Sequence, residues 1–325
     1  MNVGSFVGTL LQSTLIALSC VGSVNIAHAN PQHWKIIVGV PPGGAVDHMA
    51  RLLASQLQGY TGERYLVENK PGAQARIAAD HVKRAADERT LLMTPGVLLS
   101  LYPHTFNTLN YDPFQDFKPV AAIAKWDLAL AVAADSPASS LSQYLKALQT
   151  QTDSTLFGVA ALGNAQHLAG LALGEASQNR FEAVGFKGGQ EVVTALAGGQ
   201  ISAAILNLSE MLPLHRSGKI KILGLFSAQR NDQLPAIPTI SETVGTSLVV
   251  DSWIGLYAPR SINEPDQQRL NQLVQRALRE QSVRQNLETL SMTALPGTPA
   301  ELDALGKREH AFWQELTQSI GFAKQ

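Results

Sequence analysis

The chain has 325 residues, of which 45% are hydrophobic and 16% are charged, and its formal net charge is -1. This composition excludes a disordered chain, and the length predicts two cores of roughly 100 to 150 residues each. The 25 Lys and Arg residues and the 26 Asp and Glu residues form no basic stripe, so nucleic acid is not expected as a partner.

The first 29 residues differ from the rest. They contain no Lys, Arg, Asp or Glu, and an apolar stretch over residues 10–24 is followed by the small-x-small sequence Ala27-His28-Ala29. This pattern predicts a signal peptide that is cleaved near Ala29, and therefore export. The only cysteine, Cys20, lies inside the segment, which leaves its lipidation open and leaves the mature chain without a thiol nucleophile.

The next segment has a strand, loop, helix pattern. Residues 34–40 are an apolar run that predicts a buried strand, Pro41-Pro42-Gly43-Gly44 is a glycine loop, and apolar residues from Val46 to Leu57 recur at helical spacing. The pattern repeats with a strand over 65–67, a turn over 69–72, an alanine-rich helix over 73–86 and a strand over 90–93.

The second half repeats this order after a connector rich in proline. Its predicted elements are a strand over 156–160, a loop over 161–164, a helix through His167 to Ser177, a strand over 180–184, a loop over 186–189, a helix to Ala197 and a strand over 201–205. Alternating strands and helices predict an α/β fold with two lobes, each with a mostly parallel sheet flanked by helices.

Two apolar runs, over 121–132 and 248–257, predict the two strands that cross between the lobes. The expected division is therefore 30–128 for the first part of lobe 1, 129–253 for lobe 2, and 254–325 for the return to lobe 1. The C-terminal helices are expected to pack on the first lobe.

The glycine loops are the candidate binding elements. In open α/β sheets, ligands bind beyond the carboxyl ends of the strands, where each loop leads into a helix. A helix N-terminus presents unpaired N–H groups and a partial positive charge that attract carboxylates. The polar side chains available at these loops are Asp47, Gln74, Arg76, Asn164, His167 and Lys187.

Each of these residues also has an ordinary structural interpretation. Asp47 in a first helical turn is stabilising without any ligand. Arg76 and Lys187 can be solvated surface cations, although a cation near a helix start is better explained by an anionic partner. His167 can be a structural residue.

The sequence lacks the common enzyme motifs. The sequence has no G-x-S-x-G elbow, Walker loop, G-x-G-x-x-G, H-E-x-x-H or cysteine pair, so no cofactor or metal is expected. A triad dispersed along the chain is not visible in a single sequence. An exported α/β hydrolase or transferase that uses His167 as a base therefore stays open as an alternative.

Several motifs together resemble one family. The segments 41–51, 67–73 and 111–120, the last reading Tyr-Asp-Pro-Phe-Gln-Asp-Phe-Lys-Pro-Val, are similar in order and spacing to those of the tripartite tricarboxylate transporter substrate receptors, also called Bug proteins. Further similarity lies at 167–170, 186–189, 197–200 and 238–242. The resemblance covers nearly the whole mature chain.

The resemblance implies a periplasmic receptor of the type II binding-protein fold, without enzyme activity. Such a protein delivers a small organic acid or amino-acid-like carboxylate to a membrane permease, and we expect it to act as a monomer. Carried over by position, the ligand residues of lobe 1 are Gly43, Gly44, Ala45, Asp47, Ala73 and Gln74. Those of lobe 2 are Gly163, Asn164, Ala165, His167 and Lys187. Arg76, and Thr94 at the end of the strand over 90–93, complete the candidate set.

The second loop departs from the family pattern. The family continues this loop as Gly-Ala-Gly-Gly, whereas this chain has Gly72-Ala73-Gln74-Ala75 followed by Arg76. Side chains therefore replace hydrogens near the expected ligand, which predicts a narrower pocket or an added donor, and a ligand unlike the simplest dicarboxylates. A receptor that signals to a membrane sensor without transport stays open as a further alternative.

Overall fold

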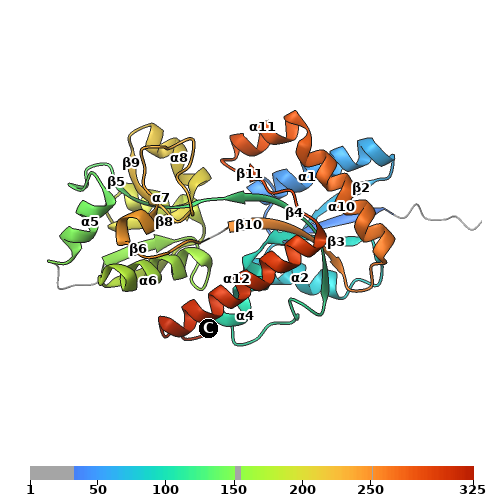
Figure 1. Ribbon diagram of the computed structural model, residues 1–325, viewed down its shortest axis with the longest axis horizontal. Helices are drawn as coiled ribbons and strands as arrows, with labels where there is room; N and C mark the ends of the chain where they lie inside the picture. The colour runs from blue at the N-terminus through green and yellow to red at the C-terminus, as the bar shows by residue number, and fades with distance from the viewer. Residues whose placement is uncertain (1–32, 151–154, 251) are drawn as a thin grey trace, which may run out of the picture. The chain divides into compact units, whose positions relative to one another are not determined.

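The computed structural model describes residues 33–150, 155–250 and 252–325. The predicted signal peptide and Cys20 lie outside the described residues. The described chain contains two β-sheets with helices on their faces (Figure 1). The first sheet carries the N-terminal strands, and the second is built from the middle of the chain.

The first sheet has six strands in the order β11-β4-β10-β3-β1-β2. Their bounds are β1 Trp34–Val38, β2 Tyr65–Asn69, β3 Thr90–Pro95, β4 Phe117–Trp126, β10 Ser252–Pro259 and β11 Thr293–Ala294. Strands β2, β1 and β3 pair in parallel, whereas β10, β4 and β11 join by antiparallel pairs.

Helices cover both faces of this sheet. On one face, α1 (Ala45–Thr61), α10 (Glu264–Arg279) and α11 (Gln281–Thr289) bury an apolar stripe that includes Met49, Leu53 and Leu270. The other face is covered by α2 (Arg76–Lys83), α3 (Val97–Ser100), α4 (Tyr102–Thr105) and α12 (Pro299–Ser319). Burial of these stripes stabilises the lobe at roughly 25 cal/mol per Å² of apolar surface.

The second sheet has five strands in the order β7-β6-β8-β5-β9. Their bounds are β5 Leu128–Ala133, β6 Thr155–Val159, β7 Phe181–Gly185, β8 Ala203–Asn207 and β9 Ile220–Leu225. The helices of this lobe are α5 (Leu141–Leu148), α6 (Ala165–Ser177), α7 (Gly189–Ala197), α8 (Leu208–Arg216) and α9 (Ile240–Val244).

The chain changes sheets at two places. Strand β4 ends at Trp126 and β5 begins at Leu128, so Asp127 alone joins them, and Figure 1 shows β4 running out of the first sheet toward β5. The return runs from the end of β9 to Ser252, where β10 begins, and the Val250 amide donates to the Phe226 carbonyl on the way. The lobe limits at 128/129 and 253/254 stay predictions.

The sheets are mixed, which differs from the expectation of mostly parallel sheets. Only three strands in each sheet pair in parallel; the strand that enters each lobe, β10 or β5, pairs antiparallel with one of them, and the strand that leaves, β4 or β9, pairs antiparallel with that entering strand. The reason is directional: a strand that enters a lobe from the crossing starts beside the carboxyl ends of the parallel strands and therefore runs opposite to them. The predicted two-lobed α/β architecture is confirmed.

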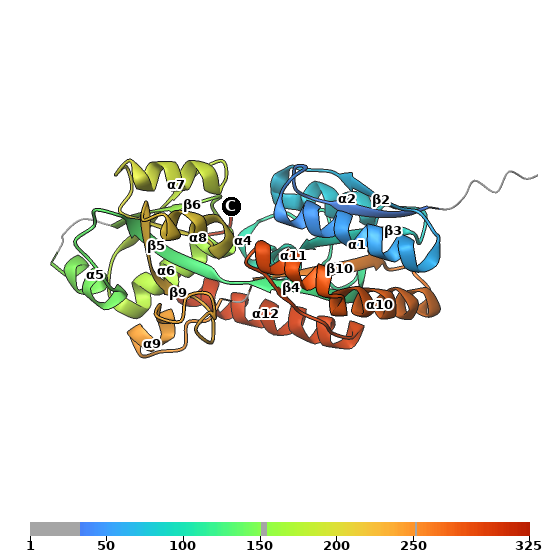
Figure 2. The ribbon, with the colours of Figure 1, turned by 90° about the horizontal axis from the view of Figure 1, so that it is seen from above.

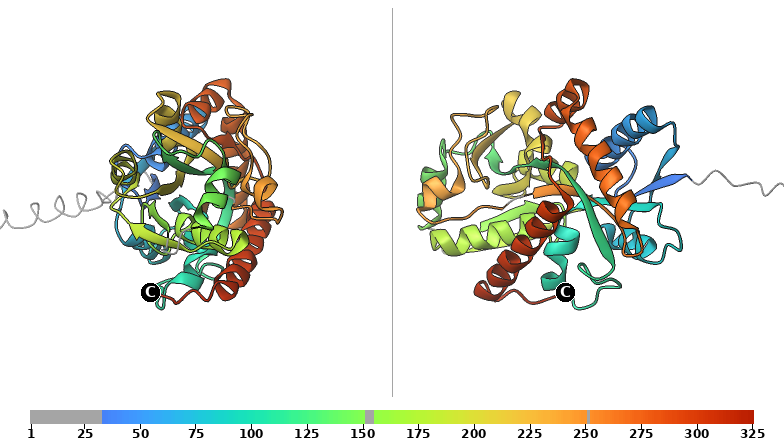
Figure 3. Two further views of the ribbon diagram at one scale, coloured as in Figure 1. Left: turned by 90° about the vertical axis from the view of Figure 1, so that its left-hand side faces the viewer. Right: turned by 45° about the vertical axis from the view of Figure 1, so that its right-hand side comes forward.

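Helix α12 packs on β4, α3 and α4, as expected for a C-terminal return to the first lobe, and Figure 2 shows it running alongside β4. It also contacts α6 of the second lobe. Beyond α12, the Gln325 amide donates to the carbonyl of Thr105 at the end of α4, where Figure 3 shows the C-terminus.

Candidate functional site

Strand register places the glycine loops of both lobes beside the crossing. In the first sheet, β10 begins next to the carboxyl ends of β3 and β4, because Ile254 pairs with Pro95 and Ser252 with Trp126. In the second sheet, Leu128 at the start of β5 pairs with Asn207 at the end of β8. The loops that follow the parallel strands of each lobe therefore lie at the edges that meet at the crossing, where open α/β sheets bind ligands.

Asp47 holds the first loop together. Its carboxylate accepts hydrogen bonds from the Gly43 amide at 2.9 Å, from Asn69 Nδ2 at 2.8 Å and from Arg51 Nε at 3.0 Å, and its side chain is only 4% exposed. Burial alone raises the pKa of Asp47, but these hydrogen bonds and the Arg51 charge outweigh it and lower the pKa to about 2.

The lone pairs of Asp47 are thus occupied by the protein itself, and the Gly43 amide is occupied with them. This geometry supports the helix-capping interpretation over direct ligand contact for these two residues. The amides of Ala45 and Val46, in the first turn of α1, have no acceptor within their own helix. They face the N-terminal end of α1, where Gly44 is the N-cap and has no side chain to accept from them. They are the donors that lobe 1 presents here.

The second loop has an unusual backbone. Ala73, Gln74 and Ala75 all have positive φ, at 46°, 54° and 70°. The expected helix over 73–86 therefore begins later, at Arg76, and ends at Lys83. Ala75 fits because Gly39, at the end of the first strand, has no side chain: a Cβ there would lie 2.2 Å from the Ala75 Cβ.

The side chains of Gln74 and Arg76, which extend from this turn, make different contacts. Gln74 Nε2 donates to the carbonyl of Leu162 in the facing lobe at 3.2 Å. Arg76 Nε donates to the Ala73 carbonyl at 2.9 Å, and its guanidinium lies 3.9 Å from the centroid of the Phe106 ring. Within the described chain neither terminal nitrogen of Arg76 has an acceptor, so this oriented cation can still bind an anion.

Thr94 lies at the carboxyl end of β3, as expected, but it is fully buried. Its hydroxyl donates to the Pro95 carbonyl at 3.3 Å. This placement makes Thr94 part of the floor below the loops.

The first loop of lobe 2 is tied to the helix that follows it. The Gly163 amide donates to His167 Nδ1 at 3.0 Å, and Asn164 caps α6 by accepting from the His167 amide at 3.0 Å. The amides of Ala165 and Gln166 have no acceptor in their own helix, which leaves two donors directed out of the N-terminus.

His167 is a neutral residue in this arrangement. Burial lowers its pKa to about 4, and its ring meets the edge of Phe322 at a centroid distance of 5.5 Å. It therefore supplies an acceptor to the loop rather than a positive charge to a ligand. Since Nδ1 is occupied by the Gly163 amide, the structure gives no support to His167 as a catalytic base.

The loop before α7 differs from the other three. The Lys187 amide donates to Glu191 Oε2 at 3.0 Å, while the Lys187 side chain is exposed. A Cβ on Gly189 would lie 2.0 Å from an oxygen of Glu210, so that carboxylate sits directly against the helix start. Burial raises the pKa of Glu210, opposed by hydrogen bonds from Asn207. Two acidic side chains, Glu191 and Glu210, already lie at this loop, and the predicted ligand contact by Lys187 stays a prediction.

Three residues near these loops were missed by the sequence analysis. Gln166 accepts from the Ala160 amide and from Asn164 Nδ2, both at 3.1 Å, and so shapes the loop before α6. Asn207 accepts from Trp126 Nε1 at 2.7 Å beside the crossing. Asn207-Leu208-Ser209-Glu210, a capping-box pattern after a strand, was a visible signal for Asn207 and Glu210.

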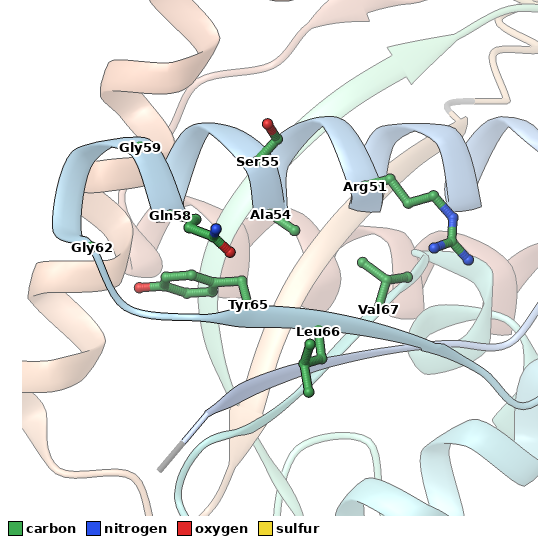
Figure 4. A pocket seen from close by; sticks show the side chains of 9 residues that line it. All are labelled: Arg51, Ala54, Ser55, Gln58, Gly59, Gly62, Tyr65, Leu66 and Val67. Carbon is green, nitrogen blue, oxygen red and sulfur yellow. The ribbon is translucent and has the colours of Figure 1, made fainter. Parts of the chain in front are cut away.

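An open groove of about 750 Å³ lies elsewhere, between α1 and β2. Figure 4 shows Tyr65 and Val67 directed toward α1 across this groove, with Arg51 at one end and Leu66 on the other side of the strand. None of the predicted ligand residues lines it, so it is distinct from the loops at the crossing.

Among residues 33–150, 155–250 and 252–325 there is no group of three or more His, Cys, Asp or Glu side chains suited to a metal ion. In the same ranges no helix has the length and apolar character needed to span a bilayer.

Comparisons with known proteins agree with this fold. The family model described as "Tripartite tricarboxylate transporter family receptor" matches residues 49–322. Protein BugT of Bordetella pertussis is 30% identical over 297 residues, which cover 88% of this chain and 89% of that protein.

Solved structures match over nearly their whole length. The periplasmic binding protein BugD has a TM-score of 0.79 and 26% identity, with 90% of this chain and 98% of that chain covered. An R. palustris protein solved with adipate has a TM-score of 0.82 and 27% identity, with 90% and 98% covered. MatC from Rhodopseudomonas palustris with bound malate has a TM-score of 0.76 and 28% identity, with 87% and 98% covered. The chain thus belongs to the tripartite tricarboxylate transporter receptor family.

Proposed function

We propose that this chain is exported, captures a small carboxylate-bearing molecule between its lobes by hinge closure, and delivers it to the membrane permease of a tripartite transporter. The observation that carries the proposal is the register of the strands, which brings the N-termini of α1 and α6 to the two edges beside the crossing. Amides at helix N-termini bind carboxylates without a cationic side chain.

The donors fall into two groups. Lobe 1 contributes the first-turn amides of α1, at Ala45 and Val46, together with the terminal nitrogens of Arg76. Lobe 2 contributes the amides of Ala165 and Gln166. In this proposal Asp47, His167 and Asn164 hold the loops in place, the predicted contacts at Gly44 and Ala73 line the space between these donors, and Thr94 is buried below them.

The similar structures support a carboxylate ligand, since two of them were solved with adipate and with malate. Their ligands concern those proteins and do not identify the ligand of this one. We further propose that the protein is a periplasmic monomer. We also propose that it has no catalytic activity, because His167, the base named for the enzyme alternative, is engaged by its own loop.

Isothermal titration calorimetry of the mature chain against a panel of mono-, di- and tricarboxylates tests the proposal. We expect at least one acid to bind with a Kd in the micromolar range, about -8 kcal/mol. Arg76→Ala should weaken that binding about tenfold or more, because a charge-assisted hydrogen bond contributes about 1.5 to 3 kcal/mol. If no carboxylate of the panel binds, the proposed function is wrong.

The matched control is Arg84→Ala. Arg84 directly follows α2, whose first residue is Arg76, but its guanidinium pairs with Asp80 at 3.0 Å and its side chain is 72% exposed. Its replacement should leave the Kd unchanged. Equal losses in the two variants would show that helix α2, and not an anion contact by Arg76, is responsible.

A further inference from the structure

Gln74 has an unmet hydrogen bond at the place where the two lobes touch. While its Nε2 donates to the Leu162 carbonyl of the facing lobe, its Oε1 is buried and has no donor among the described residues. A buried acceptor without a donor destabilises the state that contains it. The Gln74 side chain therefore lacks one hydrogen-bond donor, at Oε1.

The backbone that carries the Gln74 side chain has an energetically unfavourable conformation. Three consecutive non-glycine residues, Ala73 to Ala75, occupy the left-handed region, where a Cβ is unfavourable and glycine is not. Strained conformations of this kind persist where the surrounding structure fixes them, and they cluster at ligand clamps.

The facing lobe contains a second acceptor, the Glu210 carboxylate, whose negative charge has no cationic partner among the described residues. The Glu210 carboxylate is half-buried and, in the part of the chain that the structure describes, pairs with no Lys or Arg. Its hydrogen bonds come from Asn207, whose amide lies 3.3 Å away. Partly buried charges are normally compensated by an opposite charge or a donor.

These two acceptors belong to the same end of the site. Leu162, which accepts from Gln74, packs on Gly185, because a Cβ there would lie 2.8 Å from the Leu162 Cγ. Gly185 directly precedes the loop over 186–188, which leads to Gly189 at the start of α7, and the Glu210 carboxylate lies against Gly189. This end presents acceptors, whereas the starts of α1 and α6 present donors.

We propose that the ligand carries a hydrogen-bond donor, an amino or hydroxyl group, in addition to its carboxylate, and that Gln74 Oε1 and Glu210 select for it. This inference rests on the proposed function. Because Gln74 Nε2 is bonded to the facing lobe, separation of the lobes breaks this bond and frees the side-chain amide, so that a ligand bound in the open form meets its oxygen before closure. The negative charge of Glu210 favours an amino group over a hydroxyl.

Two matched series of acids test the inference: succinate, malate and aspartate, and glutarate, 2-hydroxyglutarate and glutamate. Within each series only hydrogen, hydroxyl or ammonium differs. Calorimetry on the mature chain should give the substituted acids a Kd about tenfold or more below that of the plain acid in at least one series. Gln74→Ala should bring this ratio close to one.

The control for Gln74 is Gln178→Ala, since Gln178 is also a left-handed glutamine, at φ 57°, but caps the distant end of α6. It should leave the ratio unchanged. Glu210→Gln keeps the capping box, which accepts Glu or Gln, and should reduce the preference for ammonium over hydroxyl. Glu242→Gln, in the capping box of α9, is its control.

The outcomes separate the two proposals. Plain and substituted acids that bind equally well to the native chain overturn this inference and leave the proposed function intact. A preference that survives both Gln74→Ala and Glu210→Gln shows that these residues do not select the donor, and also overturns it. Binding of no acid in either series overturns the inference, and the wider panel then decides the proposed function.

Discussion

Replacing Asp47 by asparagine should destabilise the protein through the first loop. The carboxylate accepts from Gly43, Asn69 and Arg51, and the pKa falls from 3.8 to about 2. This lowering of the pKa stabilises the folded state by about 2 kcal/mol, because a tenfold change in proton affinity corresponds to about 1.4 kcal/mol. Asp47→Asn removes this contribution, so the free energy of unfolding at neutral pH should fall by about 2 kcal/mol.

The pH dependence gives a sharper test. A carboxylate with a lowered folded pKa contributes its stability above the unfolded pKa and loses it as the pH falls through the folded pKa. The difference between native chain and variant should therefore be complete above about pH 5 and disappear between pH 4 and pH 2. Guanidinium denaturation of both proteins at several pH values measures it.

Asp303→Asn is the matched control. Asp303 pairs with Lys307 four residues later on α12, as Asp47 does with Arg51 on α1, but its side chain is 40% exposed. An exposed pair of this kind contributes about 0 to 1 kcal/mol. Equal stability losses in the two variants, or a loss in Asp47→Asn that persists at pH 2, would refute the reasoning.

Three further outcomes are expected. Trp126 donates to Asn207 across the crossing, so Trp126→Phe should abolish a ligand-dependent change in tryptophan fluorescence, whereas Trp253→Phe should retain it because Trp253 is buried over Gly96. Gly96→Ala should lower the free energy of unfolding in denaturant by about 1 to 3 kcal/mol, since its Cβ would lie 2.2 Å from the Trp253 ring. Burial, with the neighbouring His310, lowers the pKa of His104 to about 4. The stability that the neutral His104 side chain contributes is therefore complete above about pH 6.5 and is lost as the pH falls to about 4. His104→Gln should reduce the decrease of the denaturant midpoint over this pH range.

The order of strands, loops and helices was predictable because it depends on local apolar periodicity. The strands over 34–40 and 156–160 and the helix after His167 are read directly from spacing, and all three exist in the structure. The direction of the crossing strands was not predictable in this way, because an apolar run such as 121–132 carries no signal for where it bends between two sheets. Mixed sheets follow from that bend.

The internal bonds of the loops were beyond sequence reasoning. Asp47 and His167 each bond to the glycine amide four residues earlier, and each thereby removes a donor that the loops were expected to offer. The left-handed turn at Gln74 runs against the preference of alanine and glutamine for other backbone regions, so a helix over 73–86 was the natural prediction. Such departures from local preference are expected where tertiary contacts decide the backbone.

The contacts between the lobes divide by their distance from the crossing. Asp127 links the strands directly and accepts from Asn231 at 2.7 Å, and Trp126 bonds to Asn207; both contacts lie at the hinge, where rotation of the lobes displaces atoms less than it does farther away. The bond from Gln74 to Leu162 and the contact of Phe322 with His167 join loops and tail beyond the hinge. In a hinge motion the largest displacements occur far from the axis. The balance between open and closed forms should therefore respond to Gln74 and Phe322, while the hinge contacts preserve the direction of closure.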